Sequence, residues 1–301
     1  MYKRTIITLA LAGCLGLVQA ENNSNFYSQS STRADSIRAE LLNPEGSEII
    51  IVAHWGDWHG TFENSLHAIQ KAVEKGAKAV QMQVQKTKDG QLICFSEQDI
   101  SRLMNGEGNV SDLTLEQLRA IPVKEYRGSE DMAIIPTVKE AIEYSKDKIL
   151  LELSSDEYLD ELQQIVKETA SENVVIFNGT KAPQQGLMFI PIVDLDNDVS
   201  LDELLSLNPV AVELRYSSDD NANLQSAYDS LKGKCRVCIN TQTEGYAGSH
   251  VDVSRGVNPD DVWGVLIRQG ATVFVTDQIK PFLRYLNPDS DPKHKNAFPP
   301  K

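Results

Sequence analysis

Two neighbouring apolar segments of the chain carry polar side chains that could take part in chemistry. The run Ile49–Ala53 is followed by His54, and the run Ala79–Val84 contains Gln81 and Gln83. A histidine can give or take a proton near neutral pH. The two amides carry no charge, whereas a site for a hard divalent cation would use carboxylates. The segments therefore predict a polar site that contains a histidine but lacks the usual charge of a metal centre.

The elements that position these residues repeat along the chain as an apolar β-run, a polar end, a loop and an amphipathic helix. The predicted strands are Ile49–His54, Ala79–Val84, Ile149–Ser154, Val174–Asn178, Phe189–Asp194, Ala211–Tyr216, Arg236–Thr241 and Thr272–Asp277. The predicted helices are Asn64–Lys75, Thr114–Ala120, Thr137–Ser145, Glu157–Ala170, Leu201–Ser206, Asn221–Leu231, Pro259–Gln269 and Ile279–Leu286. This alternation is typical of an α/β protein with a TIM-like (β/α)8 barrel in a single domain. A doubly wound open sheet is the alternative, but the sequence lacks the glycine-rich phosphate-binding fingerprint of that fold.

The domain boundaries follow from the same pattern. We expect the barrel over residues 47–287, preceded by a lead-in at 21–46 that ends in a short helix near Asp35 to Leu42, and followed by a tail at 288–301. The connection between Asn178 and Phe189 leaves room for a loop but not for a helix. Chemistry in such barrels lies at the carboxyl ends of the strands, so the polar strand ends should meet at one mouth.

The first twenty residues are typical of a signal peptide. A basic start, Met1-Tyr-Lys-Arg4, precedes an apolar stretch from Thr5 to Val18, and a cut after Ala20 would release the mature chain. The segment Leu11-Ala-Gly-Cys14 also fits a lipoprotein box, which would make Cys14 a lipid anchor. Because the residues after Cys14 are apolar, cleavage after Ala20 is favoured. Both routes predict an extracytoplasmic protein, periplasmic or secreted, and the apolar stretch is short for a membrane span.

Charge and cysteine spacing exclude several kinds of partner. The chain has 301 residues and a formal net charge of −14, which argues against nucleic acid and against an anionic membrane surface. A phosphate-containing ligand would need local basic groups or a cation to offset that charge. The pair Cys235 and Cys238 has the spacing of a zinc or redox motif, but it lies in a β-pattern where the two side chains point to opposite faces. Structural packing is therefore the favoured role for both cysteines.

Several motifs occur together in a definite order along the chain. They are His54-Trp-Gly56, Glu63-Asn64, Gln81-Met-Gln83, Lys86-Thr-Lys-Asp-Gly90, Leu113-Thr-Leu-Glu-Gln-Leu118, Ile135-Pro-Thr137 and the segment from Leu266 to Asp277. Over about residues 49–286 the chain therefore resembles the glycerophosphodiester phosphodiesterase family, in a secreted bacterial branch of it. The resemblance implies a barrel that hydrolyses phosphoric diesters of lipid metabolism. A divalent cation, two acid–base histidines, an arginine and a lysine would act on the phosphodiester.

Matched position by position, this sequence keeps part of that set. His54 stands at the first histidine, Glu152 stands at the third metal carboxylate, and Glu63 and Asn64 are retained. The replaced positions are Trp55 for the phosphate arginine, Gln81 and Gln83 for the metal-binding Glu and Asp, Ser96 for the second histidine and Ser154 for the lysine. A site left with one carboxylate should bind Ca²⁺ or Mg²⁺ weakly, because affinity follows ligand charge. We expect Glu152 to accept a hydrogen bond from Gln81 or Gln83 instead of holding a metal.

The remaining candidates for substrate binding come from the rim of the barrel. Glu213, Asn240 and His250 lie at or after predicted strands and should face the same mouth as Trp55, Glu63, Asn64 and Ser154. Asp57 and His59, in the loop after the first strand, are candidates for a displaced metal site.

The sequence supports three functional hypotheses. In the favoured one, the barrel is a pseudoenzyme without a cofactor that binds a glycerophosphoryl, polyol or sugar-phosphate ligand with little or no hydrolysis. The second is an active phosphodiesterase that uses Ca²⁺ or Mg²⁺ in a rearranged site. The third is an envelope scaffold or interaction protein. Nothing in the sequence indicates an oligomeric state.

Overall fold

The computed structural model describes residues 31–124, 134–154, 156–197, 200–252 and 257–288. The chain divides into two units, Met1–Ser31 and Thr32–Lys301, and the elements below all belong to the second. The predicted signal segment 1–20, with Cys14, and the tail from residue 289 onward lie outside the described residues. None of the described helices has both the length and the apolar character needed to cross a lipid bilayer.

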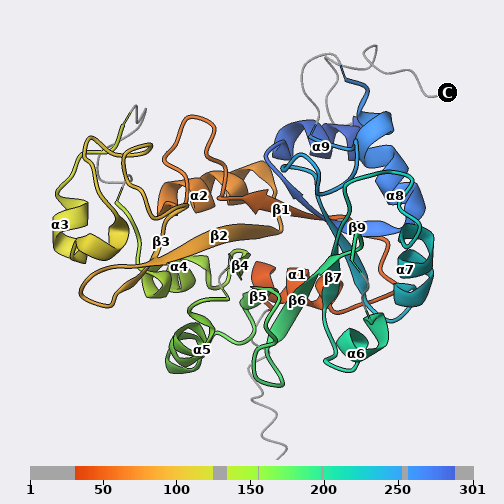
Figure 1. Cartoon of the computed structure of the whole chain (residues 1–301), viewed down its shortest axis with the longest axis horizontal. Helices are drawn as coiled ribbons and strands as arrows, with labels where there is room; N and C mark the ends of the chain where they lie inside the picture. Colours follow the sequence, from red (N-terminus) through yellow and green to blue (C-terminus); the bar gives the residue numbers. More distant parts are fainter. Residues whose placement is uncertain (1–30, 125–133, 155, 198–199, 253–256, 289–301) are drawn as a thin grey trace, which may run out of the picture. The chain divides into compact units, whose positions relative to one another are not determined.

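Parallel strands close into a barrel (Figure 1). In the described part of the chain its eight strands are β1 (Ile50–His54), β2 (Ala79–Lys86), β4 (Leu150–Ser154), β5 (Val175–Gly179), β6 (Met188–Asp194), β7 (Ala211–Arg215), β8 (Arg236–Asn240) and β9 (Ala271–Thr276). The ring closes because β1 pairs with β9 on one side and with β2 on the other. This confirms the predicted (β/α)8 barrel, and the predicted strands differ from the observed ones by only one or two residues at their ends.

Helices cover the outside of the barrel. They are α2 (Leu66–Lys75), α4 (Val138–Ser145), α5 (Leu159–Glu168), α6 (Leu201–Leu205), α7 (Leu224–Leu231), α8 (Val265–Gln269) and α9 (Ile279–Leu286). As predicted, the connection from β5 to β6 contains no helix. The predicted helix Pro259–Gln269 is instead a π-helical turn, Asp260–Gly264, that continues into α8.

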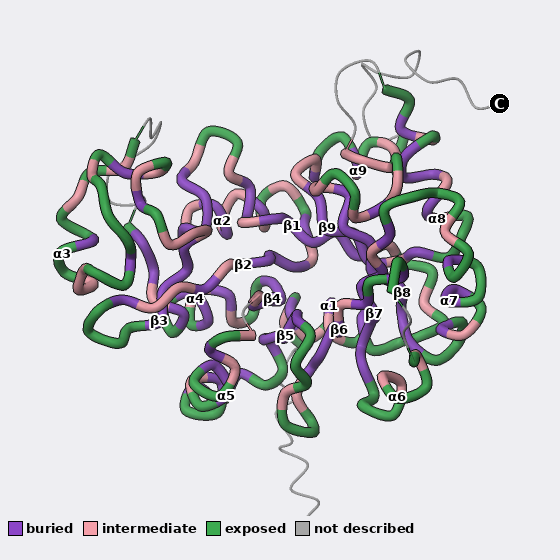
Figure 2. The backbone as a smooth tube through the Cα atoms, viewed as in Figure 1, coloured by how far each residue is buried: buried purple, intermediate pink, exposed green. Residues whose placement is uncertain are grey.

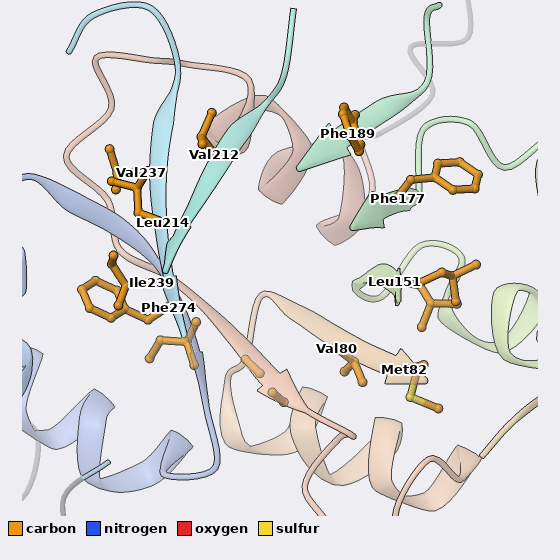
Figure 3. Close-up of a cluster of buried hydrophobic side chains, with 14 of the residues drawn as sticks. Val80, Met82, Leu151, Phe177, Phe189, Val212, Leu214, Val237, Ile239 and Phe274 are labelled. Atoms are coloured by element: carbon orange, nitrogen blue, oxygen red, sulfur yellow. The ribbon is translucent and has the colours of Figure 1, made fainter. Parts of the chain in front are cut away.

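Two hydrophobic cores result because successive side chains of a strand point to opposite faces. The outer core lies between strands and helices, and Figure 3 labels ten of its residues: Val80, Met82, Leu151, Phe177, Phe189, Val212, Leu214, Val237, Ile239 and Phe274. The inner core fills the barrel with Ile50, Val52, Ala79, Leu150, Ile176, Met188, Ile190, Ala211, Cys238, Val273 and Val275. The strands are accordingly buried over most of their length (Figure 2). Two residues further along most of these strands, the side chains that point into the barrel are polar, and they lie at its carboxyl end.

The opposite end of the barrel is closed by α1 (Arg33–Leu41), which precedes β1. Ile37 and Leu41 of α1 belong to the inner core. Arg236, at the start of β8, is 1 % exposed and donates hydrogen bonds to the carbonyl oxygens of Glu40 and Glu48. The residues at this end of the barrel therefore stabilise the fold, and we expect the functional site at the carboxyl end.

A small insertion leaves the barrel after β2. Strand β3 (Leu92–Cys94) pairs antiparallel with β2, and η1 (Val110–Asp112) and α3 (Leu115–Arg119) follow it. The insertion has its own cluster of buried side chains, which includes Phe95 and, from the loop between β1 and α2, Phe62.

The cysteines of the described residues pack as the sequence predicted. Cys94, Cys235 and Cys238 are buried free thiols. Cys238 belongs to the inner core and Cys235 to the outer core, so the two side chains point to opposite faces of β8.

Candidate functional site

A cavity of about 310 Å³ opens at the carboxyl ends of the barrel strands. We call it the mouth cavity. Of the predicted site residues, it is lined by His54, Trp55, Gln81, Gln83, Ser154 and Asn240. It is also lined by residues that the sequence reasoning did not select, among them Asp156, Asn178, Arg215, Thr243 and Tyr246. A second cavity of similar volume, which contacts Leu42, Val210 and Cys235, contains none of the predicted site residues.

Strand register explains why these side chains meet. The Cα atoms of His54, Gln81 and Glu152 are partners on three adjacent strands, so the three residues form one layer. Gln83, Ser154 and Asn178 form the next layer toward the mouth in the same way.

His54 is held by a carboxylate that the sequence reasoning missed. Its Nδ1 lies 3.2 Å from Oδ1 of Asp277, and the indole nitrogen of Trp58 donates to the same oxygen at 2.8 Å. Asp277 is the residue directly after β9, which pairs with β1. A carboxylate on Nδ1 orients the ring and leaves Nε2 for the cavity. His54 therefore has the geometry of an oriented proton acceptor.

Glu152 is a buried acid that accepts a hydrogen bond from an amide, as the sequence predicted. The side-chain nitrogen of Gln81 donates to Oε1 of Glu152 at 2.6 Å, and Glu152 is 0 % exposed. Its Oε2 is also buried and makes no hydrogen bond to any described residue. Burial and, as a smaller cause, the negative charge of Glu213 together raise the pKa of Glu152 to about 8. The carboxyl therefore carries its proton at neutral pH.

These donors do not fit a hard divalent cation. Glu152 is the one carboxyl in the layer with His54 and Gln81 and accepts a hydrogen bond from Gln81, and Gln81 and Gln83 contribute only amides. Across the described ranges, no group of three or more His, Cys, Asp or Glu side chains could hold a metal ion. The alternative candidate Asp57 is committed elsewhere, because it is buried in ion pairs with Lys75 and His59.

Ser96, Glu63 and Asn64 form a network beside the mouth cavity. Asn64 accepts a hydrogen bond from the backbone of Gln83 at 2.9 Å and donates to the Ser96 hydroxyl at 2.8 Å. Ser96 in turn donates to Glu63. Both Glu63 oxygens also accept from Arg102, at 2.5 and 3.1 Å. The Ser96 hydroxyl is therefore committed to a structural network.

The same network supports Trp55. The Arg102 guanidinium lies 5.7 Å from the centre of the Trp55 ring, and that ring lies 4.1 Å from the imidazole of His54. The hydrogen bond to Glu63 raises the pKa of Arg102, so this cation is permanent. Trp55 thus presents an aromatic surface at the cavity wall, fixed by contacts on two sides.

The far wall of the cavity is a chain of hydrogen bonds that ends on an arginine. The Ser154 hydroxyl donates to Asn178 at 3.3 Å, and Asn178 donates to Glu213 at 2.9 Å. Arg215 donates to the other oxygen of Glu213 at 2.7 Å and lies 4.0 Å from the Tyr246 ring centre. The sequence reasoning chose Glu213 but not Arg215, although the period of a strand places residues two apart on one face.

The loop after β8 does not bring His250 into the mouth cavity. The ring of His250 contacts the carbonyl of Asp261 at 3.0 Å and Asp219 at 3.5 Å. This differs from the prediction that His250 lies at the mouth. Ala247 pairs with Tyr216, which folds the loop so that Tyr246 lines the cavity.

Comparison with known proteins identifies the family. Residues 53–246 match the glycerophosphoryl diester phosphodiesterase family over well over half of the chain. The chain belongs to the glycerophosphoryl diester phosphodiesterase family.

Named relatives match a shorter part of the chain. The glycerophosphodiester phosphodiesterase of Caldanaerobacter subterraneus is 35 % identical over 107 residues, which are 34 % of this chain and 42 % of that protein. Human glycerophosphodiester phosphodiesterase 1 is 34 % identical over 106 residues, which are 34 % of this chain and 32 % of that protein. The chain thus spans less than half the length of the curated relatives it matches.

Solved structures of family members share the fold. A glycerophosphoryl diester phosphodiesterase of Parabacteroides distasonis superposes with a TM-score of 0.67 and 21 % identity, covering 87 % of this chain and 95 % of that one. A phosphodiesterase of Oleispira antarctica, in complex with the product sn-glycerol-3-phosphate, superposes with a TM-score of 0.61 and 18 % identity, covering 79 % of this chain and 96 % of that one. These structures support the barrel architecture of the family.

Proposed function

We propose that this family member binds a small glycerophosphoryl, polyol or sugar-phosphate ligand in the mouth cavity, with little or no metal-assisted hydrolysis. One observation carries the proposal. The Gln81 amide donates to Glu152 at the level of the barrel where the family pattern would place metal-binding carboxylates. A hydrogen-bonded, neutral pair there takes the place of the negative charge that a cation needs.

The acid–base residues support the same conclusion. His54 is oriented by Asp277, but Ser96, at the position of the second histidine, donates a hydrogen bond to Glu63. A serine hydroxyl cannot protonate a leaving group as an imidazolium does. Loss of one acid–base partner lowers a rate by about 10²- to 10⁴-fold.

The lining of the cavity suits a hydroxylated ligand. Ser154, Asn178 and Asn240 offer hydrogen-bonding groups, and Trp55 offers an aromatic face. The Oleispira phosphodiesterase was solved with sn-glycerol-3-phosphate, which makes that compound the natural first probe.

Calorimetry and an activity assay test the proposal together. The purified protein is titrated with CaCl₂ and with MgCl₂, and then assayed with glycerophosphocholine. We expect millimolar or absent metal binding and no metal-stimulated turnover, while sn-glycerol 3-phosphate raises the melting temperature. Micromolar metal binding with turnover would overturn the proposal.

An active phosphoric diester hydrolase with a rearranged site is the second candidate. The His54–Asp277 pair favours it, because a histidine held by a carboxylate is the usual form of a general base. In that case turnover of glycerophosphocholine should be measurable and should disappear in His54→Ala. If neither turnover nor any ligand-induced thermal shift is found, the envelope scaffold hypothesis is favoured.

A further inference from the structure

The mouth cavity has one permanent cation in its described lining. Of the lysines and arginines described, Arg215 alone lines it. In the family pattern, phosphate oxygens are held from the positions of Trp55 and Ser154, and both residues are neutral here. In the strand order of the closed ring, β7, which carries Arg215, lies directly across the barrel from β2. The positive charge therefore comes from the wall opposite Gln81 and Gln83.

The Arg215 guanidinium is fixed by two contacts. Its Nε donates to Oε1 of Glu213 at 2.7 Å, and its central carbon lies over the Tyr246 ring, 4.0 Å from the ring centre. Tyr246 is itself held, because its carbonyl oxygen accepts a hydrogen bond from the backbone of Tyr216 at 3.2 Å. A guanidinium that is already oriented loses little conformational entropy when a ligand binds.

The carboxylate of Glu213 is fully used by its neighbours. One oxygen accepts from Arg215, the other accepts from Asn178 at 2.9 Å, and the residue is 0 % exposed. Glu213 therefore orients Arg215 without facing the ligand. The two terminal nitrogens of Arg215 make no hydrogen bond to any described residue, and the side chain is 25 % exposed. They form a fork that matches two oxygens of a phosphoryl group.

The one acidic side chain in the lining is turned to the adjacent loop. Asp156 accepts hydrogen bonds from the backbone of Thr180 and Lys181 and from the Thr180 hydroxyl. Although burial opposes it, these hydrogen bonds lower the pKa of Asp156 and hold its charge on the side of that loop. A net charge of −14 for the whole chain repels anions in general, so an anion can be held only where a local cation acts at short range.

We propose that Arg215 is the anion-binding residue of the mouth cavity and selects a small phosphorylated polyol without the help of a metal. This inference rests on the proposed function and deepens it. A single guanidinium suits one phosphoryl group, and the amides and hydroxyl of Asn178, Asn240 and Ser154 supply partners for the hydroxyls of a polyol. A cavity of about 310 Å³ accommodates a ligand of that size.

The test is calorimetric titration in EDTA with three probes: sn-glycerol 3-phosphate, glycerol and inorganic phosphate. We expect the wild-type protein to bind sn-glycerol 3-phosphate more tightly than either of the other two. Arg215→Gln should weaken that binding by about 10- to 100-fold, the worth of a charge-assisted hydrogen bond, and should leave glycerol binding unchanged. Arg268→Gln is the matched control and should bind like wild type. Arg268 lies on α8 and is an exposed ion-pair partner of Asp260.

A second variant protects the test against misfolding. Removing Arg215 alone leaves Glu213 buried without its ion-pair partner, whereas the double variant Glu213→Gln/Arg215→Gln removes both charges together. The double variant should fold, as judged by circular dichroism, and should show the same selective loss of sn-glycerol 3-phosphate binding.

The outcomes separate this inference from the proposed function. Equal affinity of wild type and both Arg215 variants for sn-glycerol 3-phosphate would overturn the role of Arg215 and leave ligand binding by the cavity intact. Absence of binding by the wild-type protein both with and without EDTA would overturn both. Equal affinity for phosphate and sn-glycerol 3-phosphate would reject the polyol, and binding that EDTA abolishes would reject the metal-independent mode.

Discussion

Glu152 and Glu213 are two buried carboxyls with different partners. Glu213 is paired with Arg215 and Asn178, whereas Glu152 receives one hydrogen bond from Gln81. Glu213 thus has a cationic partner, whereas burial disfavours the charge of Glu152. A cation that stabilised a charged Glu152 would need further carboxylates as ligands. The two amides of β2 provide none, which agrees with a protonated Glu152.

The protonation of Glu152 makes stability depend on pH. Its pKa is about 8 in the folded protein and about 4.5 when unfolded, so between these values the folded state holds a proton that the unfolded state releases. Stability should fall as pH rises through this window, by up to about 1.4 kcal/mol per pH unit. Glu152→Gln cannot titrate at this position. Urea unfolding at pH 5, 6, 7 and 8 should therefore show that the stability of the variant rises relative to that of wild type as the pH increases. Parallel curves would show that Glu152 is ionised when folded.

Restoring carboxylates should create the missing metal site. Gln81→Glu/Gln83→Asp places two new acidic groups beside Glu152, which should destabilise the metal-free protein through like-charge repulsion. Calcium at 100 times its dissociation constant should then stabilise the variant by about 2.7 kcal/mol, visible as a rise in melting temperature. Gln70→Glu, an exposed change on α2, is the control and should give no calcium response. A variant that ignores calcium would show that the cavity cannot coordinate a cation even with the charge restored.

At the scale of elements, the loop from β1 to α2 positions His54 and Trp58. Trp55 and Gly56 both have positive φ angles, 55° and 79°. A Cβ atom on Gly56 would lie 2.6 Å from the Cβ of Ala68 and 2.7 Å from its carbonyl carbon. Glycine is therefore needed at residue 56 both for the backbone angle and for the close approach of the loop to α2.

Two glycines of this loop provide a matched comparison. Gly56→Ala should lower the free energy of unfolding by about 2–5 kcal/mol, since it adds backbone strain and a clash with α2. Gly60→Ala also has a positive φ, 82°, but its Cβ would meet nothing within 4 Å. That change should cost only the strain, about 1–2 kcal/mol. Denaturant unfolding of both variants measures the difference; equal costs would mean that the contact with Ala68 does not constrain the loop.

The sequence was informative about elements because barrel strands have a simple period. Most of the apolar runs are followed by a polar residue two positions beyond the inner core, which is why Gln81, Glu152 and Asn240 were found. Strand β3 was not among the predicted strands because three residues, Leu92–Cys94, show no period. Asp277 and Arg215 were missed because their roles come from partners distant in sequence, His54 and Tyr246. His250 was misplaced because loop folding is set by the pairing of Tyr216 with Ala247, which no local pattern encodes.

At the scale of the whole molecule, the two ends of the barrel have separate tasks. The carboxyl end holds the polar mouth cavity, and the amino end is closed by α1 and by the buried Arg236. Arg236 links two segments distant from it in sequence, through the carbonyls of Glu40 and Glu48. A change at this end should therefore alter stability without altering the site.

Arg236→Met tests that separation. The change removes the charge-assisted hydrogen bonds that the fully buried Arg236 donates to the carbonyls of Glu40 and Glu48, so unfolding should become easier by about 2–4 kcal/mol. Lys232→Met, an exposed change in the turn before β8, should stay within about 0.5 kcal/mol of wild type. Below the melting temperature, the affinity of Arg236→Met for sn-glycerol 3-phosphate should equal that of wild type, because the inner core lies between Arg236 and the cavity. If the affinity falls together with the stability, the two ends of the barrel are coupled, and the packing of α1 against the amino end helps to shape the mouth cavity.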